Sequence, residues 1–273
     1  MEIVGGFLIA LAIGMTGIGA GSITAPVLIL FFGLNAGDAV TAALLFGTVV
    51  KLIATPFYIA RGQVNARILG YLALGGLPAV LIGSLLLNSF NRASLTEPIL
   101  IIVGITVIIS AVATLWRSLH VNAPSRPLPL KWLPWFVAPI GLEVGFSSAG
   151  AGALGTVLLM RCTTLLPAEV VGTDLAFGLL LSVFGGSVHA SLNGVPWPTL
   201  IKLLIGGIPA VLIGTQLATV VSPRKMRFAL CVWLIYIGVQ LSYRGISGIT
   251  SAKIRPASEA VVHRVFTPAA HQR

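Results

Sequence analysis

Charged residues are scarce in this chain of 273 residues: only 9% are Asp, Glu, Lys or Arg, whereas 56% are hydrophobic. A soluble domain uses about 25% charged residues to build its polar surface. With a mean hydropathy of +1.01, the chain lacks the side chains that such a surface needs. The solvent around most of the folded protein must therefore be lipid, which excludes the class of soluble proteins.

Acidic residues and cysteines are few, with 7 Asp and Glu and 2 Cys in the whole chain. Cys162 and Cys231 both lie in apolar runs, which favours packed free thiols over a disulfide. The His and Cys residues show no metal-ligand spacing, and the chain has no phosphate-binding glycine loop and no nucleophile elbow. We therefore predict no metal, no cofactor and no direct coupling to ATP.

Basic residues outnumber acidic ones, and the formal net charge is +10. The Lys and Arg residues are scattered among the ends of apolar segments instead of gathering in one cluster. This pattern is typical of membrane loops that stay on the cytoplasmic side, and a nucleic-acid site would need a cluster. We expect the lipid bilayer as a partner and no nucleic acid.

One block of nine residues occurs twice with a single difference: 75–83 reads GGLPAVLIG and 206–214 reads GGIPAVLIG. The first copy begins at Gly75 and the second at Gly206, so the offset is 131 residues. The same offset relates GAG at 19–21 to GAG at 150–152. The chain is thus a tandem duplication of an apolar unit, as in many secondary transporters, where the substrate binds between the halves.

A membrane-spanning helix needs about 20 mostly apolar residues. We predict an all-α integral membrane protein of about eight transmembrane helices in two tandem four-helix repeats. The predicted segments are 3–32, 39–60, 68–87, 98–116, 133–160, 168–191, 200–220 and 228–243. The first repeat then takes 1–117, a proline-rich basic linker 118–132, the second repeat 133–244 and a polar basic tail 245–273.

The first segment of each repeat is broken by a glycine-rich motif, GIGAGS at 17–22 and SSAGAG at 147–152. If 3–32 crosses the membrane, each half has four crossings and the repeats are parallel. The loop charges then favour cytoplasmic termini. If 3–32 turns back at the motif as a re-entrant hairpin, each half has three crossings and the repeats are inverted. We expect the crossing and keep the hairpin as the alternative.

The two glycine motifs are the best candidates for a binding site. Backbone that leaves a helix at membrane depth has unpaired N–H groups, which survive only inside protein or beside a wet cavity. Glycine lets an anion approach these amides, and a helix that begins after the break points its positive dipole end at the gap. The competing interpretation is close helix packing through small residues. The expected substrate-binding residues are Gly17, Gly19, Gly21, Ser22, Lys51, Ser147, Ser148, Gly150 and Gly152.

Lys51 is on this list because an ammonium inside a membrane segment costs a few kcal/mol without a partner. Contact with an anion, a structural ion pair and snorkelling to the interface are the three explanations that we consider. Its repeat equivalent is Ser182. Asp174, Glu143 and His189 are candidates for coupling transport to a proton. A first-turn position is the plainer explanation of Asp174, and an interfacial ring the plainer explanation of His189.

In combination, these motifs resemble the sulfite exporter TauE/SafE family of small bacterial membrane transporters, over about residues 5–243. The chain departs from the family at Ala42 and Ala43, where Thr-Ser or Thr-Asp is usual. The resemblance implies export or uptake of a small anion such as sulfite, thiosulfate or a sulfoacetate-like compound, coupled to the proton-motive force, in the bacterial inner membrane. The matching pieces are 17–22 with Pro26, Lys51, 61–64, 147–152, 171–175 and 193–197.

The sequence therefore predicts a secondary transporter of a small sulfur-containing or organic anion and not an enzyme. The anion joins the bilayer as an expected partner, and a homodimer is compatible with the sequence. A membrane-embedded enzyme acting on a lipid or a small thiol is one alternative, with Ser147 and His189 as nucleophile and base. A non-catalytic membrane scaffold is another, and its glycine motifs would tolerate bulky replacements.

Overall fold

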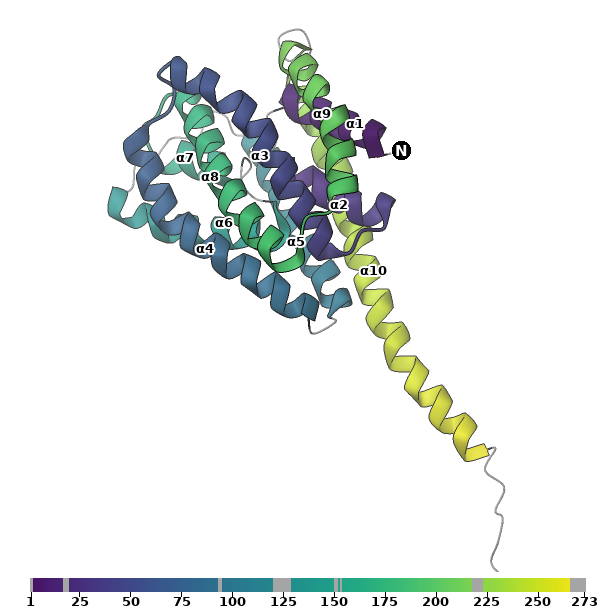
Figure 1. Cartoon of the computed structure of the whole chain (residues 1–273). Helices are drawn as coiled ribbons and strands as arrows, with labels where there is room; N and C mark the ends of the chain where they lie inside the picture. Colours follow the sequence, from purple (N-terminus) through teal and green to yellow (C-terminus); the bar gives the residue numbers. More distant parts are fainter. Residues whose placement is uncertain are drawn as a thin grey trace, which may run out of the picture.

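The computed structural model describes residues 2–16, 20–92, 95–119, 129–149, 152, 154–217 and 223–265, and their regular structure is helical (Figure 1). A short 3-10 helix, Leu130–Trp132, precedes α6. The α-helices are α1 (Glu2–Thr16), α2 (Ala20–Phe32), α3 (Ala36–Ala60), α4 (Ala66–Arg92), α5 (Thr96–Leu119), α6 (Leu133–Ser147), α7 (Leu154–Cys162), α8 (Pro167–Asn193), α9 (Trp197–Leu217) and α10 (Pro223–Val265). The chain is therefore an all-α protein, as predicted.

Six helices in the described ranges, namely α3, α4, α5, α8, α9 and α10, are long and apolar enough to cross a membrane. This number is smaller than the predicted eight. The difference lies in the first segment of each half, which forms two short helices instead of one span. With 15 residues, α1 is about 22 Å long, whereas a bilayer core is about 30 Å thick.

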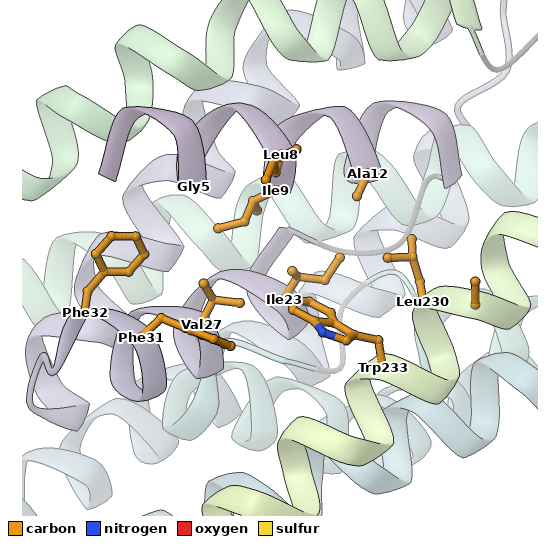
Figure 2. Close-up of a pocket in the computed structure, with 11 residues that line it drawn as sticks. Gly5, Leu8, Ile9, Ala12, Ile23, Val27, Phe31, Phe32, Leu230 and Trp233 are labelled. Carbon is orange, nitrogen blue, oxygen red and sulfur yellow. The ribbon is translucent and has the colours of Figure 1, made fainter. Parts of the chain in front are cut away.

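In the first half, the two short helices form an antiparallel hairpin. Gly5 lies near the start of α1 and Phe32 ends α2, yet a Cβ on Gly5 would be 2.8 Å from the Phe32 ring. Figure 2 shows α1 and α2 lying alongside each other. The expectation that 3–32 crosses the membrane is therefore wrong, and the segment turns back as in the alternative. Gly17 and Gly19 between the two helices disfavour a continuous helix, and the packing of Gly5 on Phe32 fixes the return of the chain.

Helices α3 and α8, which occupy equivalent positions in the two sequence copies, run antiparallel. The Leu44 side chain lies against Gly185, and the Tyr58 ring lies against Gly172. Residue numbers therefore rise along α3 as they fall along α8. The two helices hold some of the largest fully buried side chains of the protein, Phe46 and Phe177. They form the centre on which the other helices pack.

Helices α5 and α10 are a second equivalent pair, and they also run antiparallel. A Cβ on Gly245 of α10 would be 2.6 Å from Ile101, whereas Gly238 of the same helix meets Ile108. Figure 1 shows α10 continuing away from the bundle. Residues 245–265 of the expected polar tail are thus helical, because Gly245 still packs on α5. Residues 266–273, and 120–128 of the expected linker, lie outside the described residues.

The repeated glycine-proline block lies on α4 and α9 and packs in the same way in both copies. A Cβ at Gly75 would overlap the carbonyl oxygen of Pro134 in α6, and a Cβ at Gly206 would overlap that of Ile3 in α1. Pro134 and Ile3 are themselves separated by the repeat offset. Each copy of the block therefore packs backbone to backbone against the first helix of the other half, which glycine permits.

Large apolar side chains cover the outside of the helices. Trp135 is 74% exposed and Leu74 is 67% exposed, as are many other aliphatic and aromatic residues on the long helices. In water such a surface would drive aggregation. In a bilayer the same surface meets acyl chains, so the exposed residues confirm that lipid is the solvent of this fold.

Candidate functional site

The two glycine-rich breaks touch each other inside the protein. Gly21, in the first turn of α2, lies against Ser148, the residue after α6. Ser148 Oγ donates a hydrogen bond to the Gly21 carbonyl oxygen at 3.2 Å, and a Cβ on Gly21 would overlap the Ser148 carbonyl oxygen. Ser148 itself has a left-handed φ of 60°, which ends α6. The fold thus brings residues of both predicted motifs to one point.

In the chain, each break is followed by a helix, α2 from Ala20 and α7 from Leu154. The first turn of a helix offers unpaired N–H groups and the positive end of the helix dipole. Ser22, in the first turn of α2, is 1% exposed, and its Oγ has no hydrogen-bond partner among the described residues. A helix N-terminus with an additional hydroxyl donor favours the binding of an anion.

The other predicted residues of the breaks are placed as follows. Ser147 Oγ donates to the carbonyl oxygen of Glu143 at 3.1 Å, so its hydroxyl is used within α6. Gly152 is left-handed with φ 96°, just before α7. Gly17, Gly19 and Gly150 lie outside the described residues.

Lys51 is buried at the crossing of α3 and α8. Its ammonium donates to the Gly178 carbonyl oxygen at 3.0 Å and to Ser182 Oγ at 2.6 Å. Ser182 is the repeat equivalent of Lys51, so equivalent positions of the two halves are in contact here. With 7% exposure, Lys51 does not snorkel to an interface. An ammonium has three N–H donors, and these two contacts use two of them.

Asp174 is buried on α8, one turn before Gly178, and interacts electrostatically with Lys51. Its Oδ2 is 2.5 Å from Thr156 Oγ1. Its Oδ1 lies against Gly155, where a Cβ would overlap it. Because α8 begins at Pro167, Asp174 does not lie in the first turn of its own helix. Its carboxyl group lies instead at the first turn of α7.

Two further coupling candidates are Glu143, which lies on α6, and His189, which lies on α8 and contacts α6. Glu143 Oε1 is buried and has no hydrogen-bond partner among the described residues. His189 is fully buried on α8, and its Nε2 is 2.8 Å from the Gly145 carbonyl oxygen in α6. The expectation of an interfacial histidine ring is therefore wrong, because α6 covers it. The structure places neither residue in a hydrogen bond with Asp174 or Lys51.

Sequence reasoning missed two residues of this site, Thr156 and Gly155. Thr156 Oγ1 also lies 2.6 Å from the carbonyl oxygen of Gly152. It connects the second glycine break to Asp174 and, through Asp174, to Lys51. A threonine in an apolar helix usually bonds to the carbonyl oxygen four residues earlier, so the presence of Thr156 in the sequence did not indicate a binding site. Only the approach of α8 to α7 distinguishes it.

A cavity of about 700 Å³ lies between α1, α2 and α10 (Figure 2). Leu8, Val27, Phe31 and Trp233 are among its lining residues, and the lining is apolar. It includes none of the predicted substrate-binding residues. The cavity therefore offers an anion no charge and no cluster of donors. Among the described residues, no group of three His, Cys, Asp or Glu side chains is placed to hold a metal ion.

Six helices of membrane length, a hairpin, a second broken helix and a buried lysine-aspartate pair define a multi-pass integral membrane protein with a polar interior site. The family model of the sulfite exporter TauE/SafE matches residues 3–241. The chain belongs to this family, as its motifs predict, and it is a transporter and not an enzyme.

One curated relative is the probable membrane transporter protein YjnA of Bacillus subtilis (strain 168). It is 28% identical to this chain over 247 residues, which cover 86% of this chain and 96% of the relative. The similarity thus extends over both halves. No solved structure matches the chain.

Proposed function

We propose that this protein is a secondary transporter of a small sulfur-containing or organic anion, such as sulfite, thiosulfate or a sulfoacetate-like compound, in the bacterial inner membrane. The observation that carries the proposal is the contact between Gly21 and Ser148. Because Gly21 lies in the first turn of α2, the positive end of this helix lies at the contact, and α7 begins shortly after Ser148 in the chain. Ser22, whose buried hydroxyl has no partner among the described residues, adds a donor to the same place.

We further propose that the two halves are inverted repeats. The equivalent helices α3 and α8 run antiparallel, which supports a two-fold axis that lies in the plane of the membrane. The hairpin of α1 and α2 then enters from one side, and α6 with α7 enters from the other. Transporters with inverted repeats bind substrate near the middle of the bilayer, where their broken helices meet. The contact of Gly21 with Ser148, which joins the two breaks, supports this architecture.

In this proposal Lys51 supplies the positive charge of the site. Two of its donors bind α8, which fixes the ammonium at the centre of the protein. The third donor and the charge serve the anion. Gly17, Gly19, Gly21, Ser22, Ser147, Ser148, Gly150 and Gly152 form the backbone and hydroxyl part of the site. Asp174 is the leading candidate for proton coupling because it interacts with Lys51, and Glu143 and His189 are the others.

The test is uptake of radiolabelled sulfite by proteoliposomes that contain the purified protein. We expect Lys51→Ala and the isosteric neutral variant Lys51→Met to reduce uptake by more than tenfold, because the loss of a buried charge partner costs more than about 1.4 kcal/mol. Lys202→Ala is the matched control. Its side chain is 50% exposed and its ammonium pairs with Glu2 at the surface at 2.8 Å, so uptake should be unchanged.

Folding of each variant is checked by size-exclusion chromatography and by its thermal unfolding in detergent. Equal uptake by Lys51→Met and the wild type, with both folded, would contradict the role of Lys51. If the wild type transports neither sulfite nor thiosulfate nor sulfoacetate, whether the anion is supplied outside or inside the proteoliposomes, the proposed substrate class is contradicted.

A further inference from the structure

The hydroxyl of Thr156 lies between two hydrogen-bond acceptors. Thr156 Oγ1 is 2.6 Å from the Gly152 carbonyl oxygen and 2.5 Å from Asp174 Oδ2. The Thr156 and Asp174 side chains are each 4% exposed, so bulk water does not reach them. A carbonyl group and an ionised carboxylate only accept hydrogen bonds, and a hydroxyl carries one proton. The single proton of Thr156 therefore cannot satisfy both contacts.

A proton on Asp174 completes the arrangement. The Oδ2–H group then donates to Thr156 Oγ1, and the Thr156 hydroxyl donates to the Gly152 carbonyl oxygen. When Asp174 is ionised, Thr156 donates to the carboxylate instead, because a hydrogen bond to a charged acceptor is stronger. The Gly152 carbonyl oxygen then loses this bond. The protonation of Asp174 thus decides whether Thr156 holds the backbone of the second glycine break.

The same proton changes the charge at the start of α7. Gly155 and Thr156 form the first turn of this helix, and the Asp174 carboxyl group lies against both. An ionised Asp174 therefore occupies the positive helix end at which the transported anion is proposed to bind. Two negative charges at one helix end repel each other. A neutral Asp174 leaves this helix end to the anion.

Lys51 adds to this effect from α3. Its ammonium interacts with the Asp174 carboxylate, and protonation of Asp174 ends the attraction between the two charges. The positive charge of Lys51 is then available to the anion. Among the side chains that the structure describes, the other titratable groups on α8 and the helices packed on it are Asp38 and Tyr58 of α3 with Arg61 at its end, Arg67 and Tyr71 of α4, Glu143 of α6, Arg161 and Cys162 of α7, and Glu169 and His189 of α8.

We propose that Asp174 and Thr156 form a proton-binding site that couples proton and anion transport. Thr156 is the positioning residue, because its hydrogen bond to the Gly152 carbonyl oxygen forms or breaks with the protonation of Asp174. This inference rests on the proposed function and deepens it. The anion binds more tightly when Asp174 carries the proton, so the two move in the same direction through the protein. Proton-anion symport, and not exchange, is the consequence.

Transport with an imposed proton gradient tests the coupling. Uptake of radiolabelled sulfite into proteoliposomes is measured while only the internal pH is changed, so that the ionisation of the external sulfite stays constant. An alkaline interior should stimulate uptake by the wild type and by Thr156→Ser, which keeps the hydroxyl. The stimulation should be lost in Asp174→Asn, which has no titratable group, and in the nearly isosteric Thr156→Val.

Thr163→Val is the matched control. The Thr163 hydroxyl is also buried and donates to a carbonyl oxygen four residues earlier, that of Leu159, at 2.6 Å. In the part of the chain that the structure describes, it bonds to no carboxylate, and its removal should leave the stimulation unchanged. Full stimulation in folded Thr156→Val, or an equal loss in Thr163→Val, overturns the role of Thr156.

Infrared spectroscopy separates this inference from the proposed function, because it needs no transport. A pH titration of the purified protein, with Asp174→Asn subtracted, isolates the C=O stretch of protonated Asp174. This band should move to higher frequency in Thr156→Val, where its hydrogen bond is absent, and should stay in place in Thr163→Val. An unmoved band overturns the hydrogen bond even if sulfite is transported. A moved band without sulfite uptake refutes only the substrate class.

Discussion

At the scale of residues, several glycines lie so close to neighbouring atoms that no larger residue fits at their positions. Gly21 is the clearest case, because a Cβ would overlap the carbonyl oxygen of Ser148 at the contact of the two breaks. Gly155 is similar, because a Cβ would displace the carboxyl group of Asp174. These glycines determine how closely the polar groups of the site approach one another. Their replacement should therefore affect transport more than a comparable change elsewhere.

We predict that Gly21→Ala abolishes anion uptake in proteoliposomes, because the added methyl group separates α2 from Ser148. The matched control is Gly70→Ala in α4, where an added Cβ meets no atom within 4 Å. Alanine should stabilise that helix by about 0.4–1 kcal/mol and leave uptake unchanged. If Gly21→Ala takes up the anion normally and unfolds at the same temperature as the wild type, the close contact between Gly21 and Ser148 is contradicted.

At the scale of elements, the protein is held together by helix pairs that combine one helix from each half. The glycine-proline block brings α4 onto α6 and α9 onto α1. Beside each block, a phenylalanine of a central helix fills the space that the second glycine leaves: Phe177 lies on Gly76, and Phe46 lies on Gly207. The two phenylalanines are repeat equivalents, and so are the two glycines. The packing of one half therefore reappears in the other.

This packing predicts that Gly207→Ala and Gly76→Ala each lower the free energy of unfolding by about 1–3 kcal/mol, through overpacking against a ring. Shortening the facing residue should restore part of the loss, in Gly207→Ala with Phe46→Leu and in Gly76→Ala with Phe177→Leu. Unfolding in detergent titrations measures each double-mutant cycle. Additive losses in both cycles would show that the rings do not occupy these sites.

At the scale of the whole molecule, the six candidate spans lead to a different prediction for the orientation in the membrane. If both broken segments are hairpins, the loop after α3, the α5–α6 linker, the loop before α8 and the loop before α10 share one side. That side carries Arg61, Arg67, Arg117, Arg126, Lys131, Arg161, Arg224, Lys225 and Arg227. The other side carries Arg92 and Lys202 and, towards the C-terminus, Arg244, Lys253, Arg255, Arg264 and Arg273. Counted over the loops between helices alone, the positive-inside rule would place both chain ends outside the cytoplasm, opposite to the expectation from eight crossings.

Single cysteines test this arrangement in a background in which Cys162 and Cys231 are replaced by serine. Arg61 and Thr164 are both exposed, at the end of α3 and before α8. Six crossings with two hairpins place Arg61→Cys and Thr164→Cys on the same side, accessible to one impermeant maleimide from the cytoplasm. Eight crossings place them on opposite sides. Labelling from opposite sides would therefore overturn the hairpins, and labelling of both from the periplasm would overturn only the orientation.

Much of this protein follows from its sequence because the signals are local. The apolar runs predict helices and a lipid environment, and the repeat offset predicts which positions are equivalent. The glycine motifs interrupt the helices at the predicted places. The resemblance of these motifs to TauE/SafE transporters also identified the family. The direction of the chain after a break was not predictable, because glycine permits both a continued crossing and a return.

The sequence by itself determined that this is an all-α membrane protein, because composition and periodicity do not depend on long-range contacts, and its motifs identified the transporter family. Tertiary structure alone decided that α1 and α2 return as a hairpin and that α3 opposes α8. It also decided that Lys51 meets Ser182, its own repeat equivalent, and that Thr156 joins Asp174 to Gly152. These contacts join residues of different helices, and their partners are set by how the helices pack and not by spacing along the chain.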